Sequence, residues 1–239
     1  MTRKIILTIF TFCLALQVKA QTTDPQAYYT DEKEGEQKSQ SISDGQAPLA
    51  VEFKANPENL GNWEASYEWH FYVLNKDNSR TELFVRYQEN TQYTFTESGT
   101  YNIELKTNLR DGENTMELAS NVISITIGNS RLVFPNGFSP NEDGTNDKYG
   151  AMGVNDPDSP DHWKNIVSFR AIILNRWGQK LYEWNDPSGY WDGKYKGHDV
   201  NEGTYFVLVK AKGSDGKEYN IRKDVNLIRG YNKDGKTNN

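Results

Sequence analysis

The stretch Tyr67-Glu68-Trp69-His70-Phe71-Tyr72-Val73 decides the fold class, because bulky apolar side chains recur at every second position. A period of two with aromatic and β-branched residues is typical of a strand that buries one face. The same alternation returns in residues 101–105 and 122–127. Turn residues divide residues 49–127 into about seven strands, and no segment has a convincing helical period. The pattern predicts an antiparallel β-sandwich.

A second β region follows a short hinge at Gly128-Asn129-Ser130. Its strongest strands are expected at residues 167–174, 204–210 and 225–228, with turn residues between them. The sequence therefore predicts an all-β chain with two tandem antiparallel sandwiches. The expected domain bounds are residues 47–128 and 131–231.

One short pattern occurs in both regions. Ser98-Gly99-Thr100-Tyr101 opens a strand in the first, and Glu202-Gly203-Thr204-Tyr205 opens a strand in the second. A Tyr at a strand start beside a Gly turn suits a tyrosine corner, in which the phenol bonds back to the backbone. We therefore predict one such corner in each sandwich.

Residues 1–20 have the pattern of a secretory signal peptide. Arg3 and Lys4 precede an apolar run over residues 5–18, and a small-residue site follows at Val18-Lys19-Ala20. The run is too short for a stable membrane span. The only cysteine, Cys13, lies inside this segment, so the mature chain is expected to carry no thiol or disulfide.

Polar segments flank the two predicted sandwiches. Residues 21–46 are expected to form a flexible polar tether, with a short solvated helix as the alternative, and residues 232–239 a polar tail. Without residues 1–20, 24 Lys and Arg stand against 33 Asp and Glu, a formal charge of −9. Such a chain has no electrostatic reason to bind nucleic acid or anionic lipid. No later stretch is long and apolar enough for a transmembrane helix.

The first region resembles a known repeat. Residues 47–53, the strand Tyr67-Glu68-Trp69 and the path from Tyr93 to Tyr101 resemble the polycystic-kidney-disease (PKD) type of immunoglobulin-like repeat. The chain departs from that pattern directly after Trp69, where the family usually places an Asp and a Gly-Asp-Gly turn. The resemblance implies an immunoglobulin-like sandwich.

The second region carries four sequence blocks in a fixed order. They are Phe134-Pro-Asn-Gly-Phe-Ser-Pro-Asn-Glu-Asp-Gly-Thr-Asn-Asp147, Leu174-Asn175-Arg176-Trp177-Gly178, Tyr190-Trp191-Asp192-Gly193 and Gly203-Thr204-Tyr205-Phe206. In this order the blocks resemble the gliding-motility-associated C-terminal domain, which is the type B sorting domain of the type IX secretion system of Bacteroidetes. The resemblance implies export by the Sec route and then through the outer-membrane secretion machinery, with the domain as the signal. The polar tail after Gly230 departs from the usual end of such domains.

The residues expected to carry the sorting signal stand in these blocks. They are Asn136, Pro140, Asn141, Asp143, Gly144, Asn146, Asp147, Asn175, Arg176, Trp177, Gly178, Trp191, Asp192 and Gly193. Asn175 and Arg176 are expected to hold a turn through side-chain to backbone hydrogen bonds. Trp177, Trp184 and Trp191 are expected to fill the sandwich core, and stacking on a sugar or a partner surface is the alternative.

One of the blocks also concentrates oxygen ligands. Asn141, Asp143, Asn146 and Asp147 surround Gly144, and such a loop could hold a hard cation such as calcium. The preferred interpretation is a turn in which these side chains cap their own backbone. No other cofactor is expected.

Catalytic patterns are missing from the sequence. His70, His162 and His198 have no partner at metal or triad spacing, and nothing brings the carboxyls of Asp143 and Asp192 together as an acid and base pair. The loop of Asp156, Asp158 and Asp161 is expected to be solvated. We therefore expect a protein that is not an enzyme.

Two functions remain open. The first is an exported protein of the cell surface or medium, with the periplasm as the alternative location, whose first sandwich binds or spaces and whose second directs export. The other is an adhesion module in which both sandwiches contribute to a ligand surface for an envelope protein or a glycan.

Overall fold

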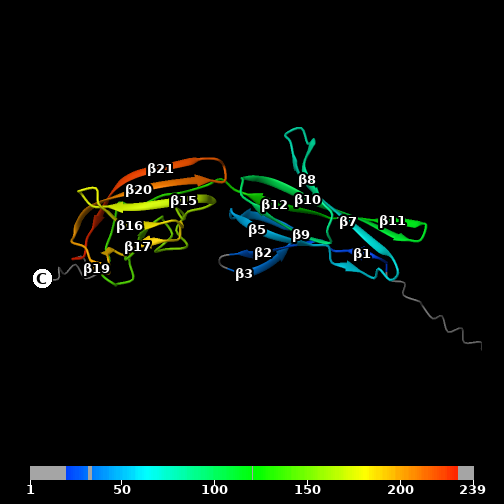
Figure 1. Cartoon of the computed structure of the whole chain (residues 1–239), viewed down its shortest axis with the longest axis horizontal. Coiled ribbons are helices and arrows are strands. Elements are labelled where there is room, and N and C mark those ends of the chain that lie inside the picture. Colours follow the sequence, from blue (N-terminus) through cyan, green and yellow to red (C-terminus); the bar gives the residue numbers. More distant parts are fainter. Residues whose placement is uncertain (1–19, 32–33, 120, 231–239) are drawn as a thin grey trace, which may run out of the picture.

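The computed structural model describes residues 20–31, 34–119 and 121–230. The predicted tail and all but the last residue of the predicted signal peptide lie outside these residues. The described chain is entirely β, and no helix in it could cross a membrane. Its strands form two sandwiches that follow each other along the long axis of the molecule (Figure 1). The predicted all-β fold is therefore confirmed.

The first sandwich packs two sheets face to face. One sheet has the strand order β3-β2-β5-β9, and the other has the order β4-β12-β10-β7-β8 with β11 also paired to β10. A short ribbon of β1 (Thr22–Thr23) and β6 (Pro57–Glu58) accompanies them. The longer strands are β2 (Gln26–Asp31), β3 (Gly35–Ser39), β4 (Ser41–Gly45), β5 (Leu49–Lys54), β7 (Glu64–Leu74), β8 (Arg80–Arg86), β9 (Asn90–Phe95), β10 (Gly99–Asp111), β11 (Asn114–Leu118) and β12 (Val122–Ile127).

The alternation that predicted the fold supplies the first core. Trp69 and Phe71 on β7 are fully buried, and both rings pack against Phe53 of the facing sheet. The indole N–H of Trp69 donates to the carbonyl oxygens of Gln88 and Glu89 at 3.0 and 3.2 Å. This buried polar group is therefore satisfied, as a sandwich core requires.

The predicted tether at residues 21–46 is wrong. This segment forms β1 to β4, with β2 paired to β5 in one sheet and β4 paired in parallel to β12 in the other. Ala27 and Ile42 lie in the core, although the residues beside Ala27 are only partly buried and those beside Ile42 are exposed. The polar composition did not predict these strands, because strands with one solvated face need few apolar residues. Hydrogen bonds to β5 and β12 satisfy backbone groups of β2 and β4.

The second sandwich has one large sheet and one irregular layer. The sheet has the order β13 (Gly137–Phe138), β21 (Glu218–Leu227), β20 (Gly203–Gly213), β15 (Ile166–Leu174) and β16 (Lys180–Trp184). The other layer holds two ribbons, β14 (Tyr149–Gly150) with β17 (Tyr190–Trp191) and β18 (Lys194–Tyr195) with β19 (His198–Asp199). Instead of a second full sheet, turn-rich segments with many Gly, Pro, Asn and Asp residues cover the core.

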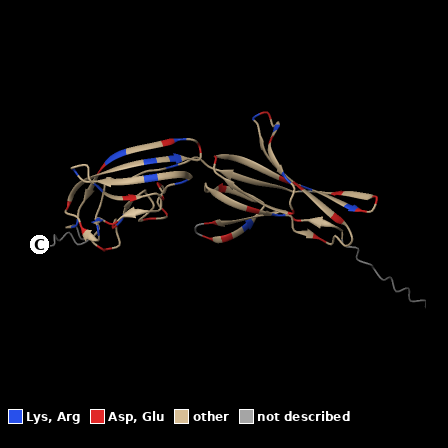
Figure 2. Cartoon of the chain, in the orientation of Figure 1, with Lys and Arg blue, Asp and Glu red and all other residues tan. Residues whose placement is uncertain are grey.

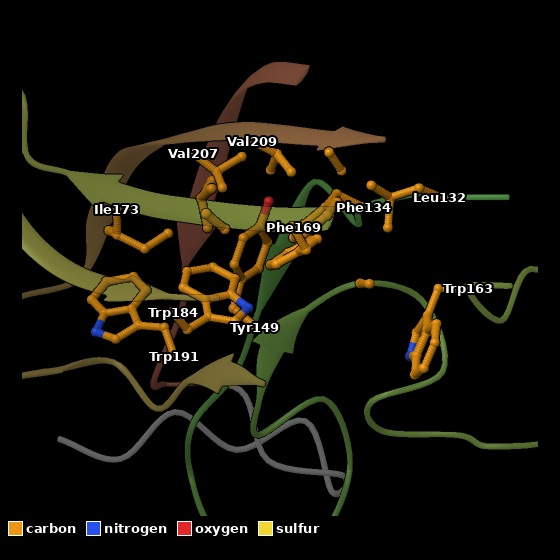
Figure 3. Packing of buried hydrophobic residues seen from close by; sticks show 14 of the residues in the cluster. Leu132, Phe134, Tyr149, Trp163, Phe169, Ile173, Trp184, Trp191, Val207 and Val209 are labelled. Carbon is orange, nitrogen blue, oxygen red and sulfur yellow. The ribbon is translucent and has the colours of Figure 1, made fainter. Parts of the chain in front are cut away.

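Aromatic side chains from both layers fill the second core. Phe134, Tyr149 and Trp191 of the irregular layer gather with Trp184 of β16 beneath the large sheet (Figure 3). Burial raises the pKa of the Tyr149 phenol, whose hydroxyl donates to the carbonyl oxygen of Pro135 at 3.1 Å. Large rings thus replace the missing strands as the source of buried apolar area.

Both predicted tyrosine corners are confirmed. The Tyr101 hydroxyl donates to the carbonyl oxygen of Glu97 at 2.9 Å, and the Tyr205 hydroxyl donates to that of Asn201 at 2.7 Å. In each case the acceptor lies four residues before the tyrosine. The same local device therefore closes one end of each sandwich.

A buried amide joins the two sandwiches. Asn165 is 1% exposed, and its Oδ1 accepts the backbone N–H of Ala47 at 2.7 Å while its Nδ2 donates to the Asn129 carbonyl at 3.2 Å. The Asn165 carbonyl accepts the N–H of Ser214 at 2.9 Å. Val167, at the start of β15, packs against the core of the first sandwich. The junction is therefore part of both folds.

The expected hinge is also held on both sides. The Ser214 hydroxyl donates to the Gly128 carbonyl at 3.2 Å, and its own carbonyl accepts the N–H of Ser98 at 3.0 Å. Ser130 donates its N–H and its hydroxyl to the Asp215 carboxylate at 3.2 and 2.7 Å. These bonds fix the chain as it passes from one sandwich to the other.

Candidate functional site

The four sequence blocks meet at the end of the second sandwich that faces away from the junction. Strand β15 ends at Leu174 beside Phe206, and Gly203 pairs with Leu227 at the end of β21. Phe138 of the first block pairs with the same Leu227. We call this region the free end. It is formed by the loops at residues 139–147, 175–179, 192–202 and 228–230.

The loop at residues 139–147 is held by its own acidic side chains. Asp147 Oδ1 accepts the N–H groups of Asn141 and Glu142 at 3.0 and 2.7 Å, and its Oδ2 accepts that of Gly144 at 2.8 Å. Asp143 accepts the N–H of Thr145 at 2.8 Å. The Asp143 bond is that of an Asx turn, whereas Asp147 accepts N–H groups of residues that precede it in the same loop. The geometry favours the self-capped turn over the calcium loop.

Two further observations concern this loop and possible metal sites. Asn146 accepts the Ser139 N–H through its backbone carbonyl at 2.9 Å and has a positive φ, which asparagine tolerates. Within residues 20–31, 34–119 and 121–230, no three His, Cys, Asp or Glu side chains gather as metal ligands. Two of the four predicted calcium ligands are amides, so this finding does not bear on them, and calcium binding at Asn141, Asp143, Asn146 and Asp147 stays a prediction.

Asn175 holds the turn of the second block, as predicted. Its Oδ1 accepts the N–H groups of Trp177 and Gln179, each at 3.0 Å, and its carbonyl accepts the N–H of Gly178 at 2.9 Å. Gly178 has φ +78°, which favours glycine. Arg176 does not take part in these bonds. Its guanidinium instead lies 5.5 Å from the Trp177 ring centroid.

Trp177 contradicts the expectation that the three tryptophans fill the core. Trp184 and Trp191 are 7% and 0% exposed, but Trp177 is 82% exposed. The Asn175 bonds fix the backbone of the turn so that this indole points away from the sandwich. A large aromatic side chain held in solvent by a satisfied turn contributes little to the core and is available to a partner.

Arg229 ties the loops of the free end together. Its guanidinium donates to the carbonyl oxygens of Pro140 and Gly193 at 3.0 and 2.8 Å and to that of Val200 at 3.4 Å. Asp199 lies 3.4 Å from the same guanidinium. A planar group with five donors can bridge several carbonyls at once. Arg229 therefore fixes the first block relative to the third.

Glu202 and Gly193 complete this arrangement. One Glu202 carboxylate oxygen accepts the N–H groups of Arg229 and Gly230, the latter at 2.7 Å. A Cβ at Gly193 would lie 3.0 Å from both the Arg229 side chain and the Pro140 ring, and the glycine has φ +77°. A larger residue at this position would therefore disturb the loops that Arg229 joins.

The tyrosine corner lies at the centre of the free end. Burial raises the pKa of the Tyr205 phenol, and the positive charges of Arg229 and Arg176 partly oppose that rise. The rings of Tyr205 and Trp191 pack edge to face at 5.2 Å, and the Trp191 N–H donates to the Lys194 carbonyl at 2.8 Å. The sequence blocks thus surround the tyrosine corner of Tyr205.

The predicted site residues therefore have different roles. Trp177 and Arg176 are exposed, whereas Trp191 is core and Asp192 caps its own turn by accepting the Lys194 N–H at 3.0 Å. Asn136 binds β21 through its carbonyl oxygen, which accepts the Asn226 N–H at 2.9 Å. The other positions shape or tie the loops and do not form a common side-chain cluster.

Arg229 and Glu202 were not predicted as site residues. Both are charged residues in polar surroundings, and in the sequence nothing distinguishes them from other surface charges. Their role depends on contacts with residues 27 to 89 positions away, which no local pattern encodes.

Residues 132–224 match the family model of the CHU_C type IX secretion signal domain. The match covers less than half of the chain and includes all four sequence blocks. It agrees with the resemblance of this region to a sorting domain. No curated protein matches the sequence at a significant level.

Several solved structures are similar to this chain at low identity. A tetra-tandem repeat from the extending region of a large adhesion protein is 13% identical over 87% of this chain and 68% of its own, with a TM-score of 0.25. The periplasmic chaperone SfaE is 11% identical over 79% of this chain and 95% of its own, with a TM-score of 0.23. Drosophila N-cadherin EC1-4 is 11% identical over 86% of this chain and 51% of its own, with a TM-score of 0.23. This chain therefore spans about half of that fragment.

Proposed function

We propose that this chain is an exported, non-catalytic protein whose second sandwich is the sorting signal for type IX secretion. The observation that carries the proposal is the family match of residues 132–224, which contain all four blocks of the free end. The destination that follows is the cell surface or the medium. The partner that follows is the outer-membrane secretion machinery.

Within this proposal, the machinery reads the free end, and Trp177 is its main contact. The indole is exposed on a turn whose backbone is already fixed, so binding would cost little backbone entropy. Aromatic anchors supply much of the affinity in protein interfaces. Arg229 has a positioning role, because it holds the loops around the tyrosine corner in one arrangement.

The first sandwich is proposed to bind a ligand or to act as a spacer. The inferred absence of catalysis is supported by the carboxyls of Asp143 and Asp192, which each accept a backbone N–H of their own turn. In the first sandwich, the two ring nitrogens of His70 lie within hydrogen-bonding distance of the Glu68 and Glu82 carboxylates, at 3.2 and 3.0 Å. The resemblance to PKD repeats stays a prediction.

The test uses point variants in the native host. Deletion of residues 131–239 would also remove Val167 from the first core and would confuse a folding defect with an export defect. We expect Trp177→Ala to shift the protein from the cell surface and medium to the periplasm, as measured by blotting medium, protease-shaved cells and periplasm. Tyr87→Ala is the matched control, because Tyr87 is 68% exposed in the first sandwich.

Three outcomes bear on the proposal. Loss of export in Trp177→Ala, with normal export of Tyr87→Ala and an unchanged melting temperature for both, supports recognition through the free end. Wild-type protein that remains in the periplasm of its own host would contradict the sorting function itself. Normal export of Trp177→Ala would contradict only the role of the indole.

A further inference from the structure

Charge is distributed unequally between the two sandwiches. Residues 21–130 contain 18 Asp and Glu against 8 Lys and Arg, a formal charge of −10, whereas residues 131–239 contain 15 against 16. The net negative charge of residues 21–239 therefore lies entirely in the first sandwich. Such an asymmetry along a chain indicates a partner that complements one half.

The large sheet of the second sandwich carries basic residues on its outer face. Arg170, Lys210, Lys212 and Arg222 all point away from the core and are exposed. Figure 2 shows basic segments in blue on β15, β20 and β21, and β21 also carries the exposed acidic residues Glu218 and Asp224 at the same alternate positions as Arg222. We call the four basic residues the cationic face.

The arrangement of the cationic face is unfavourable for the isolated domain. Arg170 and Lys210 stand directly opposite each other on β15 and β20, and like charges in that position repel. Arg170 is paired with Glu183 at 2.6 Å. Glu218 stands opposite Lys212, and Asp224 stands opposite Phe206, so two carboxylates share this outer face with the four basic residues. Within the described residues, Lys210, Lys212 and Arg222 form no ion pair, and the excess of positive charge on the face is available to an acidic surface.

An apolar strip adjoins the cationic face. Ile172 stands opposite Leu208, and Leu174 stands opposite Phe206, so four apolar side chains form two cross-strand pairs on the solvent side. Phe206 is 38% exposed, and the other three are partly buried. The outer face of an antiparallel sheet is normally polar, so this strip is unexplained by the fold alone.

We propose that the cationic face and the apolar strip bind the first sandwich of a second copy of this chain. The acidic first sandwich is the complement that the molecule itself provides. Because the two contacting surfaces differ, the contact is heterologous, and each copy keeps a free surface of the other kind. Copies therefore join into rings or open chains. This inference is independent of the sorting function.

The test measures association of purified residues 21–239 by sedimentation velocity over a wide range of concentration. We expect the sedimentation coefficient to rise with concentration at about 0.01 M salt and to fall toward the monomer value at about 1 M, because the Debye length shortens from about 30 to about 3 Å. A chain that stays monomeric at every concentration in low salt would overturn the proposal and would leave the face to a different acidic partner.

Two charge variants locate the contact. Lys210→Glu with Arg222→Glu is expected to weaken association at least tenfold, and the new Glu opposite Arg170 forms a favourable cross-strand pair that protects the fold. Lys38→Glu with Lys76→Glu makes the same change in net charge on exposed positions of the first sandwich and is expected to retain association. Equal loss in both variants would indicate general repulsion and would overturn the proposal.

An apolar variant tests the strip separately. Phe206→Ser removes the most exposed member of the strip and is expected to weaken association several-fold at both salt concentrations, since apolar contacts are not screened. Unchanged association in Phe206→Ser, Lys210→Glu and Arg222→Glu would show that copies meet elsewhere.

Discussion

The two tyrosine corners have the same geometry but opposite surroundings. The corner of Tyr101 lies at the junction, where its neighbour Ser98 donates to Ser214 of the second sandwich. The corner of Tyr205 lies at the free end among arginines and an exposed indole. In each sandwich the corner stabilises one end, and the residues around it decide whether that end is covered or open to a partner.

The largest effect is expected at the buried tryptophans, which test whether the two cores are equivalent. Trp69→Ala and Trp191→Ala should each lower the free energy of unfolding by about 3–5 kcal/mol, because each leaves a cavity in a closed core. Urea denaturation followed by fluorescence measures this. A loss below about 1 kcal/mol for Trp191→Ala would indicate that the irregular layer repacks around the gap.

A smaller effect is expected at the covered end. Asn165→Gly should lower the free energy of unfolding by about 1–3 kcal/mol, because the buried N–H of Ala47 loses its acceptor. Asn165 has φ +54°, so glycine avoids the backbone strain that alanine would add. Equal stability of wild type and Asn165→Gly would contradict a junction shared by both folds.

The corners themselves can be compared directly. Tyr101→Phe and Tyr205→Phe each remove one hydrogen bond and keep the ring, so each should cost about 0.5–1.5 kcal/mol in thermal or urea unfolding. Tyr205 is the more buried of the two, and we expect the larger loss there. A larger loss at Tyr101 would mean that docking of the second sandwich depends on the first corner.

The smallest change in stability is expected at the free end. Trp177→Ala should alter the free energy of unfolding by less than about 0.5 kcal/mol, because the side chain is 82% exposed. The same variant is expected to give the largest export defect. Circular dichroism melting of the purified variant checks the first statement, and a drop of several degrees would show that the indole has a structural role.

Sequence patterns predicted most of the fold where apolar side chains alternate. The strands around Trp69 and Ile173 and both tyrosine corners follow from period two and from a Gly beside a Tyr. Strands β2 to β4 were missed because their stability comes from hydrogen bonds to neighbouring strands and from few buried residues such as Ala27. Pairing of this kind is not encoded locally.

The sequence blocks located the loops of the free end, but they did not predict all of its residues or the contacts that hold the loops together. The blocks contain the loops that meet at the free end, and the amide of Asn175 holds its turn as expected. The exposure of Trp177 could not be read from the sequence, because an aromatic residue next to a turn is compatible with core or surface. The role of Arg229 was missed because its three carbonyl partners are distant along the chain.

The hydrogen bonds of the hinge have a consequence for the fate of the exported protein. Proteases cut segments that can leave the fold and lie extended in an active site. At residues 128–130 the carbonyls of Gly128 and Asn129 and the N–H of Ser130 are all bonded to side chains of the second sandwich. We therefore expect the connection to resist cleavage outside the cell, so that the two sandwiches remain one polypeptide after export.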